Sequence, residues 1–202
     1  MNVMISTSFL SLMDEISRQR FGYNPISREC GEFLSILLQI YSRPRDFVNV
    51  VEVGTGVGYS ALWLVKGLID GTGVGKVYTI ERNLRTAEAA KSNLKKASKV
   101  EGLERTTDCV EIIHGDAIEQ IARLDVEIDF AFIDGAKDEY LKYLDSMFPK
   151  LKAGSMVTAH NTISHSGRME DFINEIMNPE RWSTVILPID AGRGLSVSVK
   201  RL

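Results

Sequence analysis

The sequence VVEVGTGVGYSALWL, residues 50–64, places three glycines at alternate positions between two apolar runs. Glu52 lies two residues ahead of the first of these glycines, Gly54. Glycine permits tight backbone turns and a close approach of a ligand to the main chain. A glycine turn that joins a strand to a helix also directs free N–H groups at whatever binds there. The stretch therefore predicts a strand, a ligand-binding turn and a helix.

Signals for strands and helices alternate along the rest of the chain. We expect strands at residues 47–53, 76–81, 109–116, 128–134 and 154–160, and helices at residues 59–69, 83–97, 117–124, 138–148 and 168–177. Such alternation indicates parallel crossovers and a doubly wound α/β sheet with helices on both faces. Two further strands, at residues 182–189 and 194–201, can pair as an antiparallel hairpin. In a sheet of this kind the ligand lies beyond the carboxyl ends of the strands.

The length and composition are typical of one folded domain. The chain has 202 residues, of which 44% are hydrophobic and 25% charged, and no repeat or linker divides it. We expect one domain over residues 1–202, with N-terminal helices in residues 1–45 and the sheet core in residues 46–202. A second helix is expected at residues 28–41. The apolar residues of the first helix suit one face: Met4, Phe9, Leu12, Met13 and Ile16.

The compartment can be inferred from the cysteines and the N-terminus. Cys30 and Cys109 form no CxxC pair, so we expect two buried free thiols in a reducing compartment. The N-terminus lacks a basic region, and Asp14 and Glu15 interrupt its apolar stretch, which is unlike a signal peptide. No segment approaches the length of a membrane span. We therefore expect a cytoplasmic protein, and the net charge of −3 argues against a surface dominated by nucleic-acid binding.

The turn is not a dinucleotide fingerprint, because that motif needs a small residue where Tyr59 stands. No G-K-[ST] follows, which excludes a P-loop. A second acid, Glu81, ends the next strand, and a carboxylate there can accept bonds from both hydroxyls of a ribose. Glu52 could meet an ammonium group. A ligand with a ribose, an amine and no phosphates fits S-adenosylmethionine better than NAD or ATP.

The chain resembles the class I S-adenosylmethionine-dependent O-methyltransferases, in the group of the catechol and caffeoyl-CoA enzymes and their bacterial and archaeal members, some of which modify tRNA. The resemblance covers nearly the whole chain, from PISRECGEFL to GLSVSVK. It is carried by VVEVGTGVGYSALWL, YTIER, HGDA, FIDGAKDEY and HNT, in this order. It implies a Rossmann-like sheet of seven strands, mostly parallel with an antiparallel last strand.

The resemblance also implies a set of cofactor-binding residues. It places Glu52, Gly54, Thr55 and Ser60 around the methionine part of S-adenosylmethionine, Glu81 on the ribose, and Asp116 with Ala117 near the adenine. The candidates that complete this set are Gly56, Tyr59, Arg82, Gly115 and Asp134.

The reacting end is where this sequence departs from the family. Members of the family hold a divalent ion, usually magnesium, with two Asp residues and an Asn, and a lysine assists deprotonation. Asp134, Lys137 and Asn161 match the first Asp, the lysine and the Asn, but His160 replaces the second Asp. Magnesium prefers oxygen ligands, whereas zinc and later transition metals accept imidazole. One interpretation is a softer ion on Asp134, His160 and Asn161; the other is a metal-free site in which His160 or Lys137 is the base.

These observations predict an O-methyltransferase that acts on a small hydroxylated, aromatic acceptor. The alternatives are a tRNA-modifying methyltransferase of the same fold and a cofactor-binding protein without efficient catalysis. Fold alone cannot choose among them. The family and the extra N-terminal helix suggest a homodimer, although this helix could equally fold over its own pocket. His165, in the stretch SHSG, is expected to be a solvated loop residue.

Overall fold

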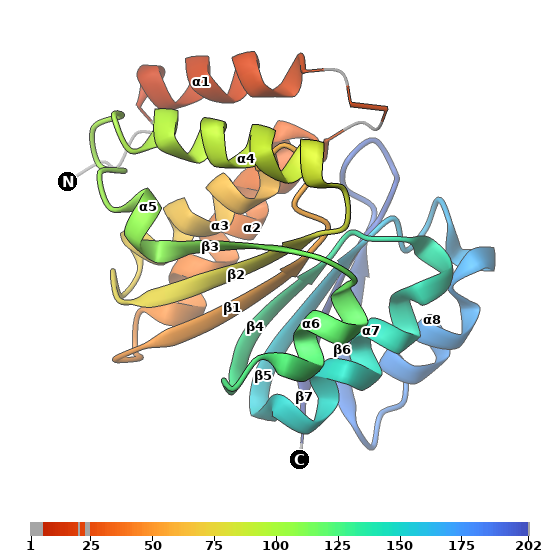
Figure 1. Cartoon of the computed structure of the whole chain (residues 1–202). Helices are drawn as coiled ribbons and strands as arrows, with labels where there is room; N and C mark the ends of the chain where they lie inside the picture. The colour runs from red at the N-terminus through yellow and green to blue at the C-terminus, as the bar shows by residue number, and fades with distance from the viewer. Residues whose placement is uncertain (1–5, 20, 23–24, 202) are drawn as a thin grey trace.

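In the computed structural model, which describes residues 6–19, 21–22 and 25–201, seven strands form one sheet (Figure 1). Their order is β3-β2-β1-β4-β5-β7-β6. Strands β1 to β5 run parallel, and β7 is antiparallel to both of its neighbours, which confirms the predicted sheet and hairpin. The bounds are β1 Val48–Val53, β2 Gly75–Glu81, β3 Val110–His114, β4 Ile128–Ile133, β5 Leu151–His160, β6 Trp182–Leu187 and β7 Leu195–Lys200.

Helices cover both faces of the sheet (Figure 1). α1 to α4 lie on one face of the sheet, and α6 to α8 lie on the opposite face. The bounds are α1 Thr7–Ser17, α2 Arg28–Ser42, α3 Tyr59–Asp70, α4 Leu84–Ala97, α5 Thr106–Cys109, α6 Ala117–Arg123, α7 Tyr140–Met147 and α8 Glu170–Ile176, with 3₁₀ turns η1 Lys137–Glu139, η2 Phe148–Lys150 and η3 Ser166–Arg168.

The central strands are apolar on both faces because each face has its own core. In β1, Val50 packs into the core shared with α1, α2 and α3. Val51 and Val53 point the other way, into the core shared with α6, α7 and α8. A parallel strand buried on both faces reads as a continuous apolar run rather than an alternating one. The run before the glycine turn is therefore explained by its central place in the sheet.

Most boundaries agree with the sequence within two residues, and the exceptions have local causes. The expected helix at 138–148 begins as the η1 turn, and Pro149 lies in η2, where proline can no longer continue the helix. β5 begins at Leu151, three residues before the expected start, and includes Gly154 with φ +86°. The short helix α5 was not predicted. Met4 lies outside the described residues, whereas the other apolar residues expected on the face of α1 are buried.

The topology puts the glycine turn at the switch point of the sheet. From β1 the chain crosses to β2 on one side, while β4 lies on the other. In open α/β sheets the ligand crevice forms where the strand order reverses, at the carboxyl ends of the strands. In the part of the chain that the structure describes, no helix is long and apolar enough to cross a membrane.

Candidate active site

A cavity of about 630 Å³ opens at the carboxyl ends of β1, β2, β4 and β5. The site residues predicted from the sequence that line it are Gly54, Thr55, Gly56, Tyr59, Ser60, Glu81, Arg82, Gly115, Ala117, Asp134, Lys137, His160 and Asn161. Sequence reasoning missed the following lining residues: Pro25, Ile26, Val53, Val57, Ile80, Gly135, Ala136, Tyr143 and Arg193. Several of these are ordinary apolar residues next to a motif, which no pattern separates from core positions.

The glycine turn needs its glycines. Gly54, Gly56 and Gly58 have φ values of +95°, +53° and +86°, in the left-handed region that side chains disfavour. A Cβ on Gly54 would also lie 2.5 Å from the carbonyl oxygen of Asp134, because the end of β4 packs directly against the turn. The glycine turn therefore packs against the backbone of Asp134, a residue that lines the reacting end of the cavity.

Glu81 is held by two backbone N–H groups. Its Oε2 accepts a hydrogen bond of 2.9 Å from the N–H of Gly56, and its Oε1 accepts one of 2.8 Å from the N–H of Asn83. The side chain therefore fixes the glycine turn to the start of α4. Because each carboxylate oxygen has a second lone pair, Glu81 can still accept bonds from a ligand.

Glu52 does not line the cavity, which corrects the expectation that it contacts the ligand's ammonium group. The side chain lies under the glycine turn and is fully buried. The hydroxyl of Thr79 donates a 2.5 Å bond to Oε2 of Glu52 and is 2.6 Å from the hydroxyl of Thr55. Burial raises the pKa of Glu52 to about 8, although hydrogen bonds from Ser60 and Thr79 oppose the shift. The residue supports the turn from below.

Asp116 is not among the lining residues of the cavity, although its neighbours Gly115 and Ala117 are. Its Oδ1 caps α6 by accepting the N–H of Ile118 at 3.0 Å, and its Oδ2 accepts a 2.9 Å bond from Arg82. Asp116 thus caps α6 between two lining residues, and its expected place near the adenine stays a prediction. Aspartate is a favoured N-cap residue, and Asp116 directly precedes α6.

The reacting end of the cavity is built around Asp134, the first residue after β4. Lys137 Nζ donates to Asp134 Oδ1 at 2.7 Å, to the carbonyl of Gly135 at 3.2 Å and to Tyr140 Oη at 2.9 Å. Burial raises the pKa of Asp134, but the contact with His160 and the charge of Lys137 outweigh burial and hold the pKa below its ordinary value. All three ammonium hydrogens of Lys137 have acceptors, which favours a fixed cation over a base.

His160, the last residue of β5, lies between two carboxylates. Its Nδ1 is 3.4 Å from Asp134 Oδ1, and its Nε2 is 2.7 Å from Asp190 Oδ2. The imidazole is 3% exposed, and neither ring nitrogen has the directional geometry of a hydrogen bond. Asp190 was not recognised in the sequence, where the stretch DAGRG indicates only the turn of a hairpin. Its role depends on folding that turn back onto β5.

Two polar residues follow His160 at the rim of the cavity. Asn161 has φ +63°, and its amide Nδ2 donates to Ser164 Oγ at 3.3 Å. The same hydroxyl is 2.9 Å from Nδ1 of His165. His165 lines the cavity, so it is more than the solvated loop residue that its sequence context suggested.

A magnesium ion does not fit this set of residues. Magnesium binds through carboxylates and keeps near-octahedral oxygen coordination. At the reacting end, the carboxylate that lines the cavity is Asp134, and Lys137 already donates to its Oδ1. His160 supplies nitrogen instead of oxygen, and a carboxylate faces each of its ring nitrogens. The structure therefore differs from the magnesium site of the resembled family at His160, the residue at which the sequence also differs.

Comparison with known proteins identifies relatives over most of the chain. A family model described as O-methyltransferase matches residues 6–187. The catechol O-methyltransferase of Mycobacterium tuberculosis is 29% identical over 143 residues, which cover 70% of this chain and 59% of that protein. That of Niastella koreensis is 30% identical over 142 residues, covering 68% of this chain and 58% of that protein. The chain spans about three-fifths of the length of these curated relatives.

Solved structures share the fold. An O-methyltransferase from Bacillus cereus in complex with SAH has a TM-score of 0.79 at 22% identity and covers 99% of this chain and 93% of its own. The O-methyltransferase TomG from Streptomyces achromogenes, in complex with SAM, has a TM-score of 0.78 at 20% identity and covers 100% of this chain and 93% of its own. Since the family model spans most of the sequence, the chain belongs to the O-methyltransferase family.

Proposed function

We propose that this protein transfers the methyl group of S-adenosylmethionine to a hydroxyl of a small aromatic acceptor. The observation that carries the proposal is one continuous cavity. The glycine turn and Glu81 line the part suited to an amino acid and a ribose, and Asp134 and His160 line the part suited to a reacting hydroxyl. The relatives named as catechol O-methyltransferases support the choice of a phenolic acceptor.

The geometry suggests how these residues serve methyl transfer. The reaction is an in-line displacement in which the acceptor oxygen bonds to the methyl carbon while the sulfur–carbon bond breaks. Holding both reactants in line supplies several kcal/mol of the barrier. Asp134, kept ionised by Lys137, places negative charge beside the sulfonium end of the cavity. An acceptor hydroxyl with a pKa near 10 must also lose its proton, which requires a nearby base.

The acceptor class can be tested by incubating the full chain with methyl-labelled S-adenosylmethionine. One reaction contains simple catechols, a second contains small-molecule extract, and a third contains unmodified tRNA. Label in the small-molecule fractions supports the proposal. Label in tRNA alone would instead establish the tRNA-modifying alternative. Binding of S-adenosylmethionine without transfer to any of the three would favour a cofactor-binding protein.

Glu81→Ala is expected to weaken binding of S-adenosylmethionine by about 1–3 kcal/mol, because a buried ribose loses its acceptor and the N–H of Gly56 loses its partner. Glu81→Gln keeps one acceptor oxygen and should lose less. Isothermal titration calorimetry measures both variants, with NAD as the comparison ligand. Unchanged affinity in Glu81→Ala would remove this residue from the site.

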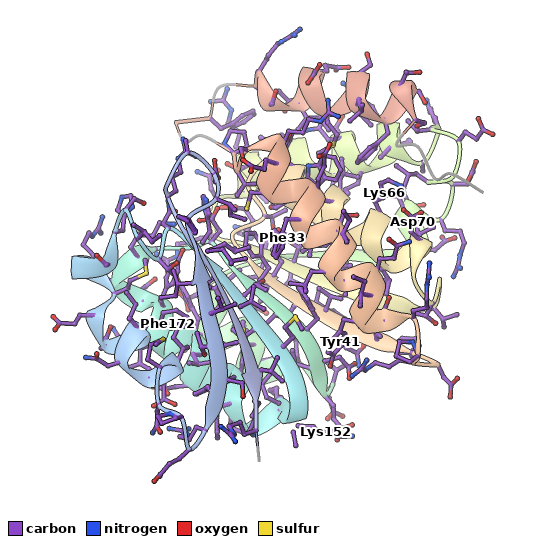
Figure 2. The ribbon with its side chains drawn as sticks, turned by 180° about the vertical axis from the view of Figure 1, so that it is seen from behind. Phe33, Tyr41, Lys66, Asp70, Lys152 and Phe172 are labelled. Atoms are coloured by element: carbon purple, nitrogen blue, oxygen red, sulfur yellow. The ribbon has the colours of Figure 1, made fainter. Side chains whose placement is uncertain are left out.

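We also propose that the protein is a homodimer, on the basis of α2 and the edge strand β6. Figure 2 shows the face of the molecule on which α2 lies, between the labelled residues Phe33 and Tyr41. Outward on this helix, Ile36 and Ile40 are 55% and 67% exposed, and Val185 on β6 is 50% exposed. Ile36 and Ile40 are four residues apart on α2 and so share one side of the helix, and an exposed apolar patch of this kind marks an interaction surface. The apolar face of α1 is used within the chain instead, as its buried residues join the core of α2 and α3.

Sedimentation velocity of the full chain at micromolar concentration is expected to show a dimer, and Ile40→Glu should shift it toward monomer because the new charge opposes burial of the patch. A matched control is Lys91→Glu, on the exposed face of α4, which should leave the dimer intact. A wild-type protein that sediments only as monomer would contradict the proposal.

The two buried free cysteines, Cys30 and Cys109, fit a reducing compartment, and we place the protein in the cytoplasm.

A further inference from the structure

The two ring nitrogens of His160 face different surroundings. Nδ1 faces Asp134, which lines the cavity together with His160 itself. Nε2 faces Asp190, whose side chain is 3% exposed and which does not line the cavity. Nδ1 is therefore on the side of the ring that faces the reacting end, and Nε2 is on the side that faces the protein interior. Both nitrogens are buried and neither has a hydrogen bond of good geometry, so the two differ in the carboxylate that each faces.

Asp190 is fixed in place by the fold. Its Oδ2 accepts a 3.0 Å hydrogen bond from the N–H of Ser27, the residue that caps α2. Its backbone adopts φ +58°, a left-handed conformation, in the turn between β6 and β7. A buried carboxylate must be paired to be tolerated. The nearest cationic or imidazole nitrogens are His160 Nε2 at 2.7 Å and Arg193 Nη1 at 3.7 Å.

We propose that Asp190 and His160 form a proton-accepting dyad that replaces the family's divalent ion. Asp190 is the positioning residue and His160 the catalytic residue; the inference rests on the proposed O-methyl transfer. The acceptor's O–H proton passes to Nδ1 as its oxygen bonds to the methyl carbon. The electron pair of the broken sulfur–carbon bond stays on sulfur. The imidazolium then lies between Asp190 and Asp134 and releases its proton to water. A carboxylate that orients and stabilises a catalytic imidazolium acts in this way in other enzymes.

The charges around residue 160 match a histidine better than an aspartate. An aspartate there would join Asp134 and Asp190 and place three carboxylates together. The cations close to them are Lys137 and Arg193, which would leave one negative charge unbalanced. An imidazole removes one negative charge and accepts the positive charge during the reaction. A histidine at position 160 therefore suits the charge of Asp190 better than an aspartate would.

Two further titratable groups lie near the dyad: the hydroxyl of Tyr140, which donates to the carbonyl of His160 at 3.2 Å, and the thiol of Cys30 on α2. Its sulfur and the ligand atoms of His160 and Asp190 lie within 4.8 Å of one another, and all three residues are buried. Burial and, secondarily, the charges of Asp190 and Asp134 raise the pKa of the thiol, so the thiol is neutral. The Nε2–Oδ2 distance of 2.7 Å is that of a paired imidazole and carboxylate, and is shorter than two ligands of one tetrahedral zinc ion allow.

Metal binding tests the replacement without any acceptor. Calorimetric titration of the full chain, bound to S-adenosylhomocysteine, with Mn²⁺ and Mg²⁺ is expected to show no saturable site. His160→Asp should create one, with affinity at least about tenfold above His160→Asn, which has the same loss of imidazole without the new charge. Retained S-adenosylhomocysteine binding confirms that each variant is folded. One ion per wild-type chain would overturn the proposal, as would zinc that is lost in Cys30→Ser.

Activity tests the dyad itself. Wild-type methyl transfer should be unchanged by a chelator, and Asp190→Asn should lower kcat while KM for S-adenosylmethionine stays constant. Asp190→Glu, which keeps a carboxylate, should recover part of the kcat that Asp190→Asn loses. A purely structural role would raise KM for S-adenosylmethionine along with the loss of kcat, and Asp190→Glu would recover no kcat. If transfer occurs only with an added ion, the proposed function stands and the dyad is overturned.

Discussion

Gly54→Ala is expected to destabilise the protein by about 3 kcal/mol or more and to abolish detectable binding of S-adenosylmethionine. The residue has φ +95°, which costs an alanine energy by itself. A new Cβ would also lie 2.5 Å from the backbone oxygen of Asp134, and a backbone atom at the end of a buried strand cannot move aside cheaply. Urea unfolding measures the first effect and calorimetry the second.

Gly102→Ala is the matched control, because it separates backbone strain from the clash. Gly102 has φ +81°, and a Cβ there would have no atom within 4 Å. Its alanine variant should lose only about 1 kcal/mol, the cost of the left-handed conformation, and should bind the cofactor normally. If the two variants lose equal stability, the close contact between the turn and β4 does not have the importance assigned to it.

Glu52→Gln is expected to become steadily more stable than wild type as the pH rises from about 5 to 8. The carboxyl ionises near pH 4.5 in the unfolded chain but at about 8 in the folded protein, because it is buried. The unfolded chain therefore releases its proton first. The wild type keeps the full contribution below pH 4.5 and loses it as the pH rises through the folded pKa, by on the order of 4 kcal/mol. Glutamine, which does not ionise, avoids this loss.

Urea unfolding of both proteins at pH 5 and pH 8.5 measures the difference. Glu88→Gln, an exposed position on α4, is the control and should follow the wild type at both pH values. If Glu52→Gln and wild type keep a constant difference in unfolding free energy, Glu52 is not held neutral in the folded protein. The result also bears on the site, since Glu52 connects through Thr79 to the cavity residue Thr55.

The fold could be predicted because its signals are local. Apolar runs of strand length, helix formers and turn residues follow one another in the order that a doubly wound sheet requires. The positions that follow each strand then converge at one edge by topology alone, which is why Glu81, Asp134 and His160 meet in the cavity. The boundaries that differed, such as the start of β5, lie where a glycine interrupts a strand.

The contacts of the site were less predictable because side-chain direction depends on tertiary packing. Side chains of β1 alternate between the two faces of the sheet, which buries Glu52 beneath the glycine turn. The carboxylate of Asp116 caps the N-terminus of α6. Asp190 lies 30 residues after His160 in the chain and meets it only because β7 pairs antiparallel with β5. No spacing rule connects two such residues, so the partner of His160 became visible only in the fold.

The measurement that tests the central claim most directly is single-turnover transfer of labelled methyl from S-adenosylmethionine to a catechol by the full chain, with His160→Asn beside it. We expect one S-adenosylhomocysteine for each methylated acceptor in the wild type. The rate in the variant should be at least about 100-fold lower, while its cofactor affinity should be unchanged. Binding of NAD in place of S-adenosylmethionine, or bound S-adenosylmethionine that methylates no hydroxyl of any acceptor offered, would contradict the account.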